Sequence, residues 1–111
     1  MTKDPLVFIE HIWECIELIE TYIQQKTLDL FHKTTQLQDA VIHRLEIIGE
    51  AVKNIPEDFK AENPEIPWKD IARTRDKLIH GYFGIDLDLV WEITQKDIKD
   101  LKENISRLRR L

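Results

Sequence analysis

The sequence predicts an all-α fold, a bundle of four main helices joined by short helical pieces. Apolar residues recur at spacings of three and four in four segments, and no segment shows the two-residue alternation of a strand. The chain has no internal repeat, and it contains only three Gly and four Pro in 111 residues. Its composition, 42% hydrophobic and 33% charged, is typical of a compact domain and not of a disordered chain. This length fits a single domain over residues 1–111.

The first helix is expected from Pro5 to about Gln24. Asp4 is a good N-cap, and proline is favoured at the first helical position. One face of this helix carries the apolar stripe Ile9, Ile12, Ile16, Ile19 and Ile23. The polar segment 25–35 is interpreted as a connector with one short helical turn.

The second helix is expected to begin near Gln36 and to end at Pro56. Gly49 lies inside it and should cost roughly 1 kcal/mol relative to alanine, so we expect a neighbouring backbone to pack closely there. Residues 56–66 are interpreted as a loop with a short helical piece. The apolar stripe of the second helix is Val41, Leu45, Ile48, Val52 and Ile55.

The third helix is expected to start at Pro67 and Trp68 and to end at Gly81, with His80 in its final turn. Its predicted buried residues are Trp68, Ile71, Leu78 and Ile79. Asp86 should cap a long last helix, with Ile85 and Val90 placed for a hydrophobic staple. The stripe of that helix is Leu87, Trp91, Thr94, Ile98, Leu101, Ile105 and Leu108.

Four apolar residues lie off these stripes: Ile42, Ile47, Leu89 and Ile93. A second apolar face on a helix of a small bundle favours a homodimer. The same pattern fits helices that are buried on two sides within one chain. The two interpretations have equal weight.

Charge and cysteine content restrict the class of protein. The net charge of −5 argues against a protein that coats nucleic acid, but Arg73, Arg75 and Lys77 form a local basic cluster. No stretch is apolar enough for a membrane span, and the N-terminus lacks the features of a signal peptide. The single cysteine, Cys15, excludes an internal disulfide and favours a cytoplasmic location.

The segment from Arg75 to Tyr82 carries groups suited to metal-independent RNA cleavage. His80 can act as acid or base near neutral pH, and Arg75 can stabilise phosphate charge. On a regular helix these two residues lie about 140° apart, so they cannot form one site on one face. Either the helix ends before His80, or the same residues of a second subunit complete the site. Asp76 is four residues before His80 and can orient its ring.

Ordinary structural roles also fit these residues. Histidine is favourable near a helix C-terminus, Arg75 and Asp76 are typical ion-pair residues, and Tyr82 fits a core aromatic. His11 and Cys15 have a metal-ligand spacing, but two ligands make no zinc site, so neither a metal nor another cofactor is expected.

Several segments of the sequence, taken together in their order and spacing, resemble the HepT family of HEPN-domain proteins. They are Gln38-Asp-Ala-Val-Ile-His-Arg-Leu-Glu-Ile-Ile-Gly-Glu-Ala51, Pro64-Glu-Ile-Pro-Trp-Lys-Asp-Ile71, the Arg75 to Tyr82 motif and Asp88-Leu-Val-Trp91. The resemblance extends from about Asp4 to Leu108.

This resemblance implies a homodimeric HEPN bundle that acts as a metal-independent endoribonuclease toxin on transfer or messenger RNA. Arg75 and His80 would be catalytic at a dimer cleft, and Asp76 would support them where many relatives have Asn. Independently of the resemblance, the local basic cluster predicts weak RNA binding by Arg73 and Lys77. Tyr82 would be modified with AMP by a cognate minimal nucleotidyltransferase antitoxin. The added negative charge would then repel RNA.

Two other functions remain open at this point. The chain could bind a nucleotide or RNA without cutting it, as a partner subunit of a nucleotidyltransferase. It could also be a purely structural helical dimer.

Overall fold

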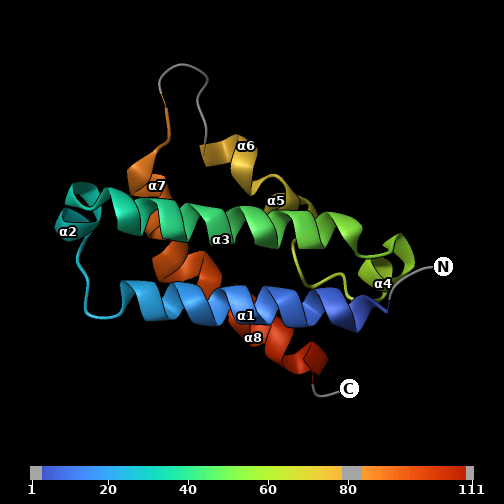
Figure 1. Cartoon of the computed structure of the whole chain (residues 1–111). Helices are drawn as coiled ribbons and strands as arrows, with labels where there is room; N and C mark the ends of the chain where they lie inside the picture. The colour runs from blue at the N-terminus through green and yellow to red at the C-terminus, as the bar shows by residue number, and fades with distance from the viewer. Residues whose placement is uncertain (1–3, 79–83, 110–111) are drawn as a thin grey trace.

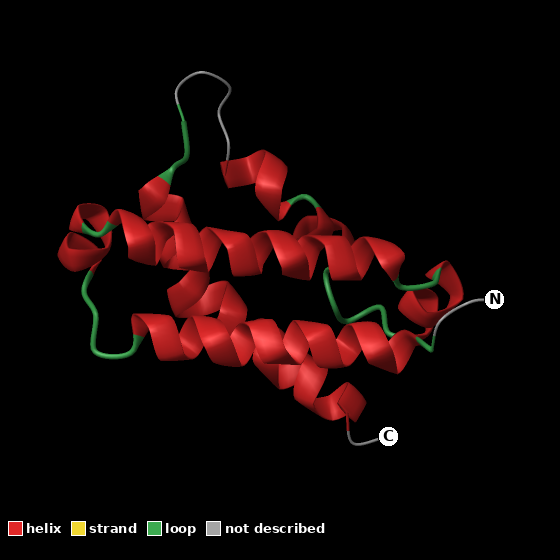
Figure 2. Ribbon diagram, viewed as in Figure 1, coloured by secondary structure: helices red, strands yellow, loops and turns green. Residues whose placement is uncertain are grey.

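The computed structural model describes residues 4–78 and 84–109, and these residues form a helical bundle (Figures 1 and 2). The all-α expectation is confirmed. The elements are α1 (Pro5–Ile23), α2 (Leu28–Lys33), α3 (Thr35–Asn54), α4 (Glu57–Glu62), α5 (Trp68–Ala72), α6 (Thr74–Leu78), α7 (Leu87–Glu92), the π-helical turn η2 (Ile93–Asp97) and α8 (Ile98–Arg109).

The two longest helices, α1 and α3, pack side by side in opposite directions at the centre of the molecule (Figure 1). The start of α1 is as expected, because the backbone N–H of Leu6 donates to Asp4 Oδ1 at 3.0 Å and Pro5 occupies the first turn. The isoleucines of the α1 stripe face the core, and Ile12, Ile16 and Ile19 are fully buried.

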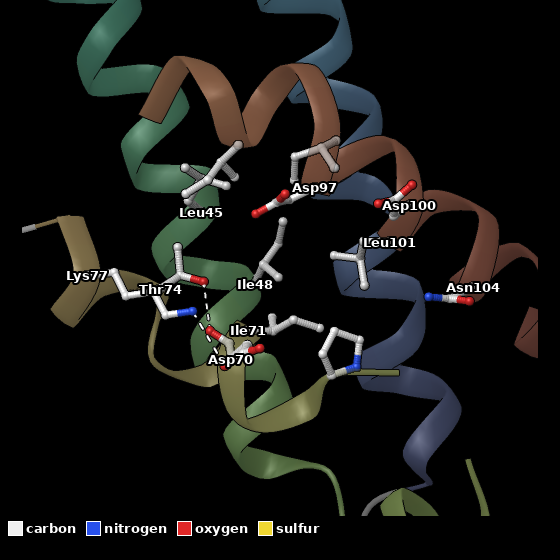
Figure 3. A pocket seen from close by; sticks show the side chains of 13 residues that line it. Leu45, Ile48, Asp70, Ile71, Thr74, Lys77, Asp97, Asp100, Leu101 and Asn104 are labelled. Atoms are coloured by element: carbon white, nitrogen blue, oxygen red, sulfur yellow. Dashed lines mark hydrogen bonds and ion pairs between the residues drawn. The ribbon is translucent and has the colours of Figure 1, made fainter. Parts of the chain in front are cut away.

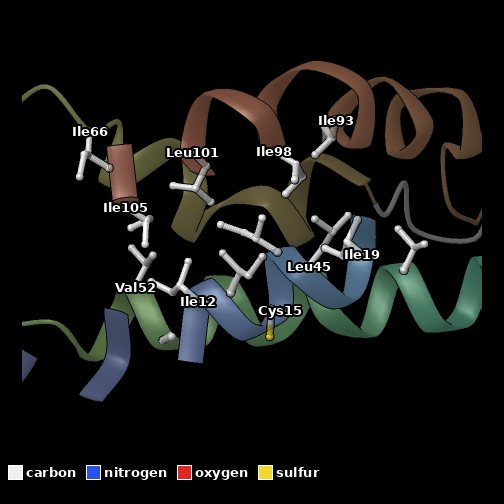
Figure 4. Packing of buried hydrophobic residues seen from close by; sticks show 14 of the residues in the cluster. Ile12, Cys15, Ile19, Leu45, Val52, Ile66, Ile93, Ile98, Leu101 and Ile105 are labelled. Atoms are coloured by element: carbon white, nitrogen blue, oxygen red, sulfur yellow. The ribbon is translucent and has the colours of Figure 1, made fainter. Parts of the chain in front are cut away.

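The C-terminal helix α8 packs across α1 and completes the core (Figures 1 and 4). Its buried residues Ile98, Leu101, Ile105 and Leu108 follow the expected spacing of three and four. They belong to the same apolar cluster as the stripes of α1 and α3. Because a fully buried aliphatic side chain contributes roughly 1.5–3 kcal/mol, this shared cluster is the main stabilising feature of the fold.

Both connectors contain one short helix, as the sequence predicts. Thr27 caps α2 by accepting a hydrogen bond from the Leu30 N–H at 3.1 Å, and Phe31 of α2 is fully buried. The Phe31 ring lies 5.4 Å from the ring of Trp91 on α7, measured between centroids. The second connector forms α4, which has no buried residue.

The prediction of one continuous third helix is wrong, because the helix breaks at Arg73 between α5 and α6. Arg73 has φ −95° and ψ 4°, outside the ideal α-helical values, and its N–H donates to the carbonyls of Ile71 and Lys69. Both α5 and α6 pack against α3, and the break lets the chain change direction between them (Figure 1). Trp68 and Leu78 are buried as expected, whereas Ile71 is only half-buried.

The last helix is also less regular than its spacing predicts. Asp86 caps it as expected, by accepting from the Leu89 N–H at 3.0 Å. The π-helical turn η2 then interrupts it, and Ile93 and Ile98, five residues apart, are both buried. A spacing of five is out of register for a regular α-helix and fits the i→i+5 pattern of a π turn. The predicted stripe placed Leu87 and Trp91 in the core, but both are half-buried. Val90 and Ile93 are buried in their place.

The four off-stripe residues are accommodated within one chain. Ile42 and Ile93 are buried, and Ile47 and Leu89 are partly buried against the core. Burial on two sides accounts for their apolar character, so they give no support to a dimer. The homodimer remains a prediction.

None of the helices within residues 4–78 and 84–109 combines the length and the apolarity that crossing a membrane requires.

Candidate functional site

The segment that leads to the predicted site starts from a fixed corner at α5. Trp68 is buried, and its indole N–H donates to the Asn63 carbonyl at 3.0 Å. The Asn63 amide in turn donates to the Phe59 carbonyl at 2.9 Å, and the rings of Phe59 and Trp68 meet edge to face with centroids 6.5 Å apart. These contacts fix where α5 begins and so where α6 lies.

The next helix, α6, carries the backbone of Arg75. It is held to α5 by two contacts: the Thr74 hydroxyl donates to the Asp70 carbonyl at 3.3 Å, and Lys77 Nζ lies 3.5 Å from Asp70 Oδ1. The buried side chain of Leu78 anchors its other end in the core. Arg75 therefore lies on a short helix with contacts on both sides.

After the segment that carries His80 and Tyr82, the chain is hydrogen-bonded to the end of α6. The N–H of Asp86 donates to the Leu78 carbonyl at 2.9 Å, which joins the end of α6 to the start of α7. His80, Gly81 and Tyr82 lie outside the described residues, as do Ile79 and the side chain of Arg75. The predicted roles of Arg75, His80 and Tyr82 therefore stay predictions.

The predicted supporting residues lie on the surface around α6. Arg73 and Asp76 are exposed. The Lys77 side chain is about half exposed and is paired with Asp70, which lies just before the basic cluster in the sequence. The region before His80 is therefore less cationic than the sequence between Ile71 and Tyr82 indicates.

A pocket beside α6 was not predicted from the sequence (Figure 3). It has a volume of about 260 Å³ and lies between α3, the α5–α6 corner, η2 and α8. Thr74 and Lys77 of α6 line one side, and Asp97, Asp100 and Asn104 line the other. Each of these last three residues directly precedes a buried isoleucine or leucine. They form a polar stripe beside the apolar stripe of the last helix, and this stripe is the only sign of the pocket wall that the sequence contains.

The remaining groups that the sequence singled out have structural surroundings. Burial raises the pKa of the Cys15 thiol, and the hydrogen bond from Arg44 opposes that rise. Arg44 also hydrogen-bonds Tyr22, and these two contacts raise its own pKa. His11 is exposed on α1. Among the residues that the structure describes, no three His, Cys, Asp or Glu side chains are grouped to hold a metal ion.

Comparison with known proteins identifies the family. The model of the HepT-like ribonuclease family matches residues 12–108. A probable ribonuclease HepT from Thermococcus cleftensis is 50% identical over 110 residues, which are 99% of this chain and 100% of that protein. A putative RNase from Methanocaldococcus jannaschii is 47% identical over 107 residues, 93% of this chain and 88% of the relative.

A further relative is longer. The Methanocaldococcus jannaschii protein named gamma-glutamylcyclotransferase and putative RNase is 53% identical over 108 residues, 97% of this chain but 49% of that protein. The chain thus spans about half the length of this relative. No solved structure matches the chain. Because the family model covers most of the sequence and the matched relatives include one of equal extent, the chain belongs to the HepT-like ribonuclease family.

Proposed function

We propose that the protein is a metal-independent endoribonuclease in which His80 transfers protons and Arg75 stabilises the charged phosphate. The observation that carries this proposal is the family match over residues 12–108, which includes the arginine and the histidine in one motif. The position of Arg75 on α6, a helix anchored to α5 and to the core, supports it. Stabilisation of a phosphorane requires a cation in a defined place, and an anchored helix fixes the backbone that carries this arginine.

The chemistry follows from the two side chains. His80 takes the proton of the ribose 2′-hydroxyl, and the oxygen formed attacks the adjacent phosphorus. The bond to the 5′-oxygen breaks, and this leaving oxygen receives a proton from an imidazolium. The products are a 2′,3′-cyclic phosphate and a 5′-hydroxyl. Arg75 binds the non-bridging oxygens while the negative charge develops.

The biological role is proposed as that of the toxin in a toxin–antitoxin pair. A nucleotidyltransferase antitoxin would transfer AMP from ATP to the Tyr82 hydroxyl, with release of pyrophosphate. The adenylate adds a negative charge two residues from His80, and that charge would repel an RNA phosphate. A mass shift on co-expression that is lost in Tyr82→Phe is the expected sign of this modification.

Cleavage is tested with purified protein and a structured RNA in the presence of EDTA. His80→Ala should lower the rate by about 10²–10⁴-fold, because general acid–base catalysis contributes that much. Arg75→Ala should lower it by about 10²–10³-fold, the usual cost of losing one group that stabilises transition-state charge.

Two matched substitutions serve as controls. His11→Ala and Arg107→Ala each remove the same residue type from an exposed position, and both should leave the rate unchanged. Full activity of His80→Ala would contradict the proposal. Tight RNA or nucleotide binding without cleavage by the wild type would indicate the non-catalytic partner subunit instead.

A further inference from the structure

The pocket beside α6 has an apolar floor that suits a flat ring. Residues of α3, α5, η2 and α8 form this floor, and Figure 3 shows their side chains converging on one space. The volume of about 260 Å³ lies just below the roughly 300–1,000 Å³ of pockets for drug-sized ligands, so a smaller ligand fits. The apolar residues of the floor are Leu45, Ile48, Ile71, Ile93, Ile98 and Leu101.

The rim of the pocket carries hydrogen-bond acceptors on one side. Asp97 and Asp100 have no ion-pair or hydrogen-bond partner among the described residues, whereas Asp70 is held by Lys77 at 3.5 Å. In Figure 3 the Asp97 carboxylate points across the pocket toward α3, between Leu45 and Ile48, and the Asp100 side chain points away. Asp97 is the last residue of the π turn η2, and π turns occur frequently at functional sites.

The pocket also lies next to the residue that the proposed mechanism uses. Thr74 and Lys77, which line the pocket, stand one residue before and two residues after Arg75 on α6. At 1.5 Å of rise per residue, the Arg75 backbone is within about 3 Å of both along the helix axis. Around a regular helix Arg75 lies about 100° from Thr74 and about 160° from Lys77, so the RNA backbone must bend around α6 for a base next to a phosphate at Arg75 to enter the pocket.

We propose that this pocket binds a guanine base next to the cleaved phosphate, with Asp97 as the residue that determines specificity. An ionised carboxylate only accepts hydrogen bonds, so it selects an edge that presents donors. Guanine presents N1–H and the N2 amine side by side, which match the two oxygens of one carboxylate. Adenine and cytosine place an acceptor nitrogen beside their amine, and uracil places its single N–H between two carbonyls.

The charges at the rim of the pocket keep the sugar and phosphate of the nucleotide outside it. The rim carboxylates repel phosphate, so the sugar–phosphate chain passes outside the pocket on the side of Lys77 and exposed Arg73. The neutral base alone enters, as in proteins that read single-stranded RNA by splaying bases out and bonding their Watson–Crick edges. This inference rests on the proposed ribonuclease function, because RNA must be the ligand.

The first test measures binding without cleavage. The probes are 2′-O-methylated trinucleotides UXU, which cannot be cut, with guanine, inosine or adenine at the centre. Wild-type protein should bind the guanine probe about tenfold more tightly than the inosine probe, which lacks only the N2 amine. Asp97→Asn should abolish this difference, whereas Asp39→Asn, an equal change at an exposed position of α3, should preserve it.

The second test maps cleavage positions in an RNA of mixed sequence. Wild-type protein should cut next to guanine, and Asp97→Asn should lose that preference while it still cuts. Equal binding of guanine and inosine probes, or a guanine preference that survives Asp97→Asn, would overturn the inference. A guanine preference in binding with no cleavage of any RNA would refute the ribonuclease function and leave the base site standing.

Discussion

Gly49 lies buried in the middle of α3, where the backbone of α5 approaches it. A Cβ atom at this position would lie 3.5 Å from the Ile71 carbonyl oxygen and 3.7 Å from that of Ala72. The expected neighbouring backbone is therefore present, but the space also admits a methyl group at ordinary van der Waals distance.

Gly49→Ala should accordingly stabilise the protein, by about 0.5–1 kcal/mol in the free energy of unfolding, because alanine loses less backbone entropy in a helix. Urea denaturation followed by circular dichroism measures the change. Glu50→Ala, on the exposed face of the same helix, should change stability much less and serves as the comparison. A large loss of stability in Gly49→Ala would show that the α3–α5 contact is tighter than this geometry.

Glu10 and Arg109 connect the start of α1 to the end of α8. Arg109 donates to both carboxylate oxygens, at 2.5 and 3.1 Å, and its guanidinium carbon lies 4.3 Å from the centre of the Trp13 ring. The hydrogen bond from Arg109 lowers the pKa of Glu10 below its ordinary value of 4.5. A lowered carboxyl pKa stabilises the fold above the ordinary value, and this contribution disappears as the pH falls through the folded pKa.

The difference in Tm between wild type and Glu10→Gln should thus be constant above pH 4.5 and should shrink below it. Thermal unfolding between pH 7 and pH 3 measures it. In an Arg109→Gln background, Glu10→Gln should show no such pH dependence, because the hydrogen bond that lowers the pKa of Glu10 is absent. A difference that grows on acidification would contradict the assigned direction of the pKa shift.

Between elements, α2 is attached to α7 by one apolar and one polar contact. Phe31 is fully buried against Trp91, and next to it His32 Nε2 lies 2.6 Å from Asp88 Oδ1. The histidine is 42% exposed and the aspartate 74%, so solvent screens the polar contact. This attachment matters to the site because α7 is the first helix after the Arg75 to Tyr82 segment.

Phe31→Ala should therefore lower the free energy of unfolding by about 3–5 kcal/mol, through lost burial and the cavity left behind. Asp88→Asn should lower it by less than about 1 kcal/mol, as exposed ion pairs usually do. Chemical denaturation of both variants gives the comparison. Similar losses in the two variants would mean that the polar contact carries more of the attachment than its exposure indicates.

For the whole molecule, a mixture of two variants tests whether the proposed catalytic site is shared between two chains. If Arg75 of one subunit acts with His80 of the other, a mixed dimer of Arg75→Ala and His80→Ala contains one intact site. Equal mixing after reversible dissociation should then restore about a quarter of the wild-type rate, since half of the dimers are mixed and each has one site of two.

Two outcomes would speak against a shared site. No recovery from a mixture that sedimentation shows to contain dimers would place Arg75 and His80 of one chain in the same site. A monomeric wild type that still cuts RNA would show that no second chain is needed. Either result would leave the catalytic residues unchanged.

The helical class, the caps at Asp4 and Asp86 and the family could all be predicted from the residues in order. Caps and apolar stripes depend on neighbours within about four positions, and a family motif depends on order and spacing, so both are readable from a sequence. The break at Arg73, the π turn and the ion pair of Lys77 with Asp70 could not be. They arise where α5, α6 and η2 adapt to α3 and α8, and such packing overrides local preference.

The pocket is the clearest case of a feature that depends on tertiary packing and not on local sequence. Leu45, Asp70 and Asp97 are more than 20 residues apart in the chain, yet all three line it. No local spacing relates these residues, because their proximity follows from how whole helices pack together. The sequence therefore identified the proposed catalytic motif, whereas tertiary packing alone decided which side chains surround α6 and, by our inference, which base they accept.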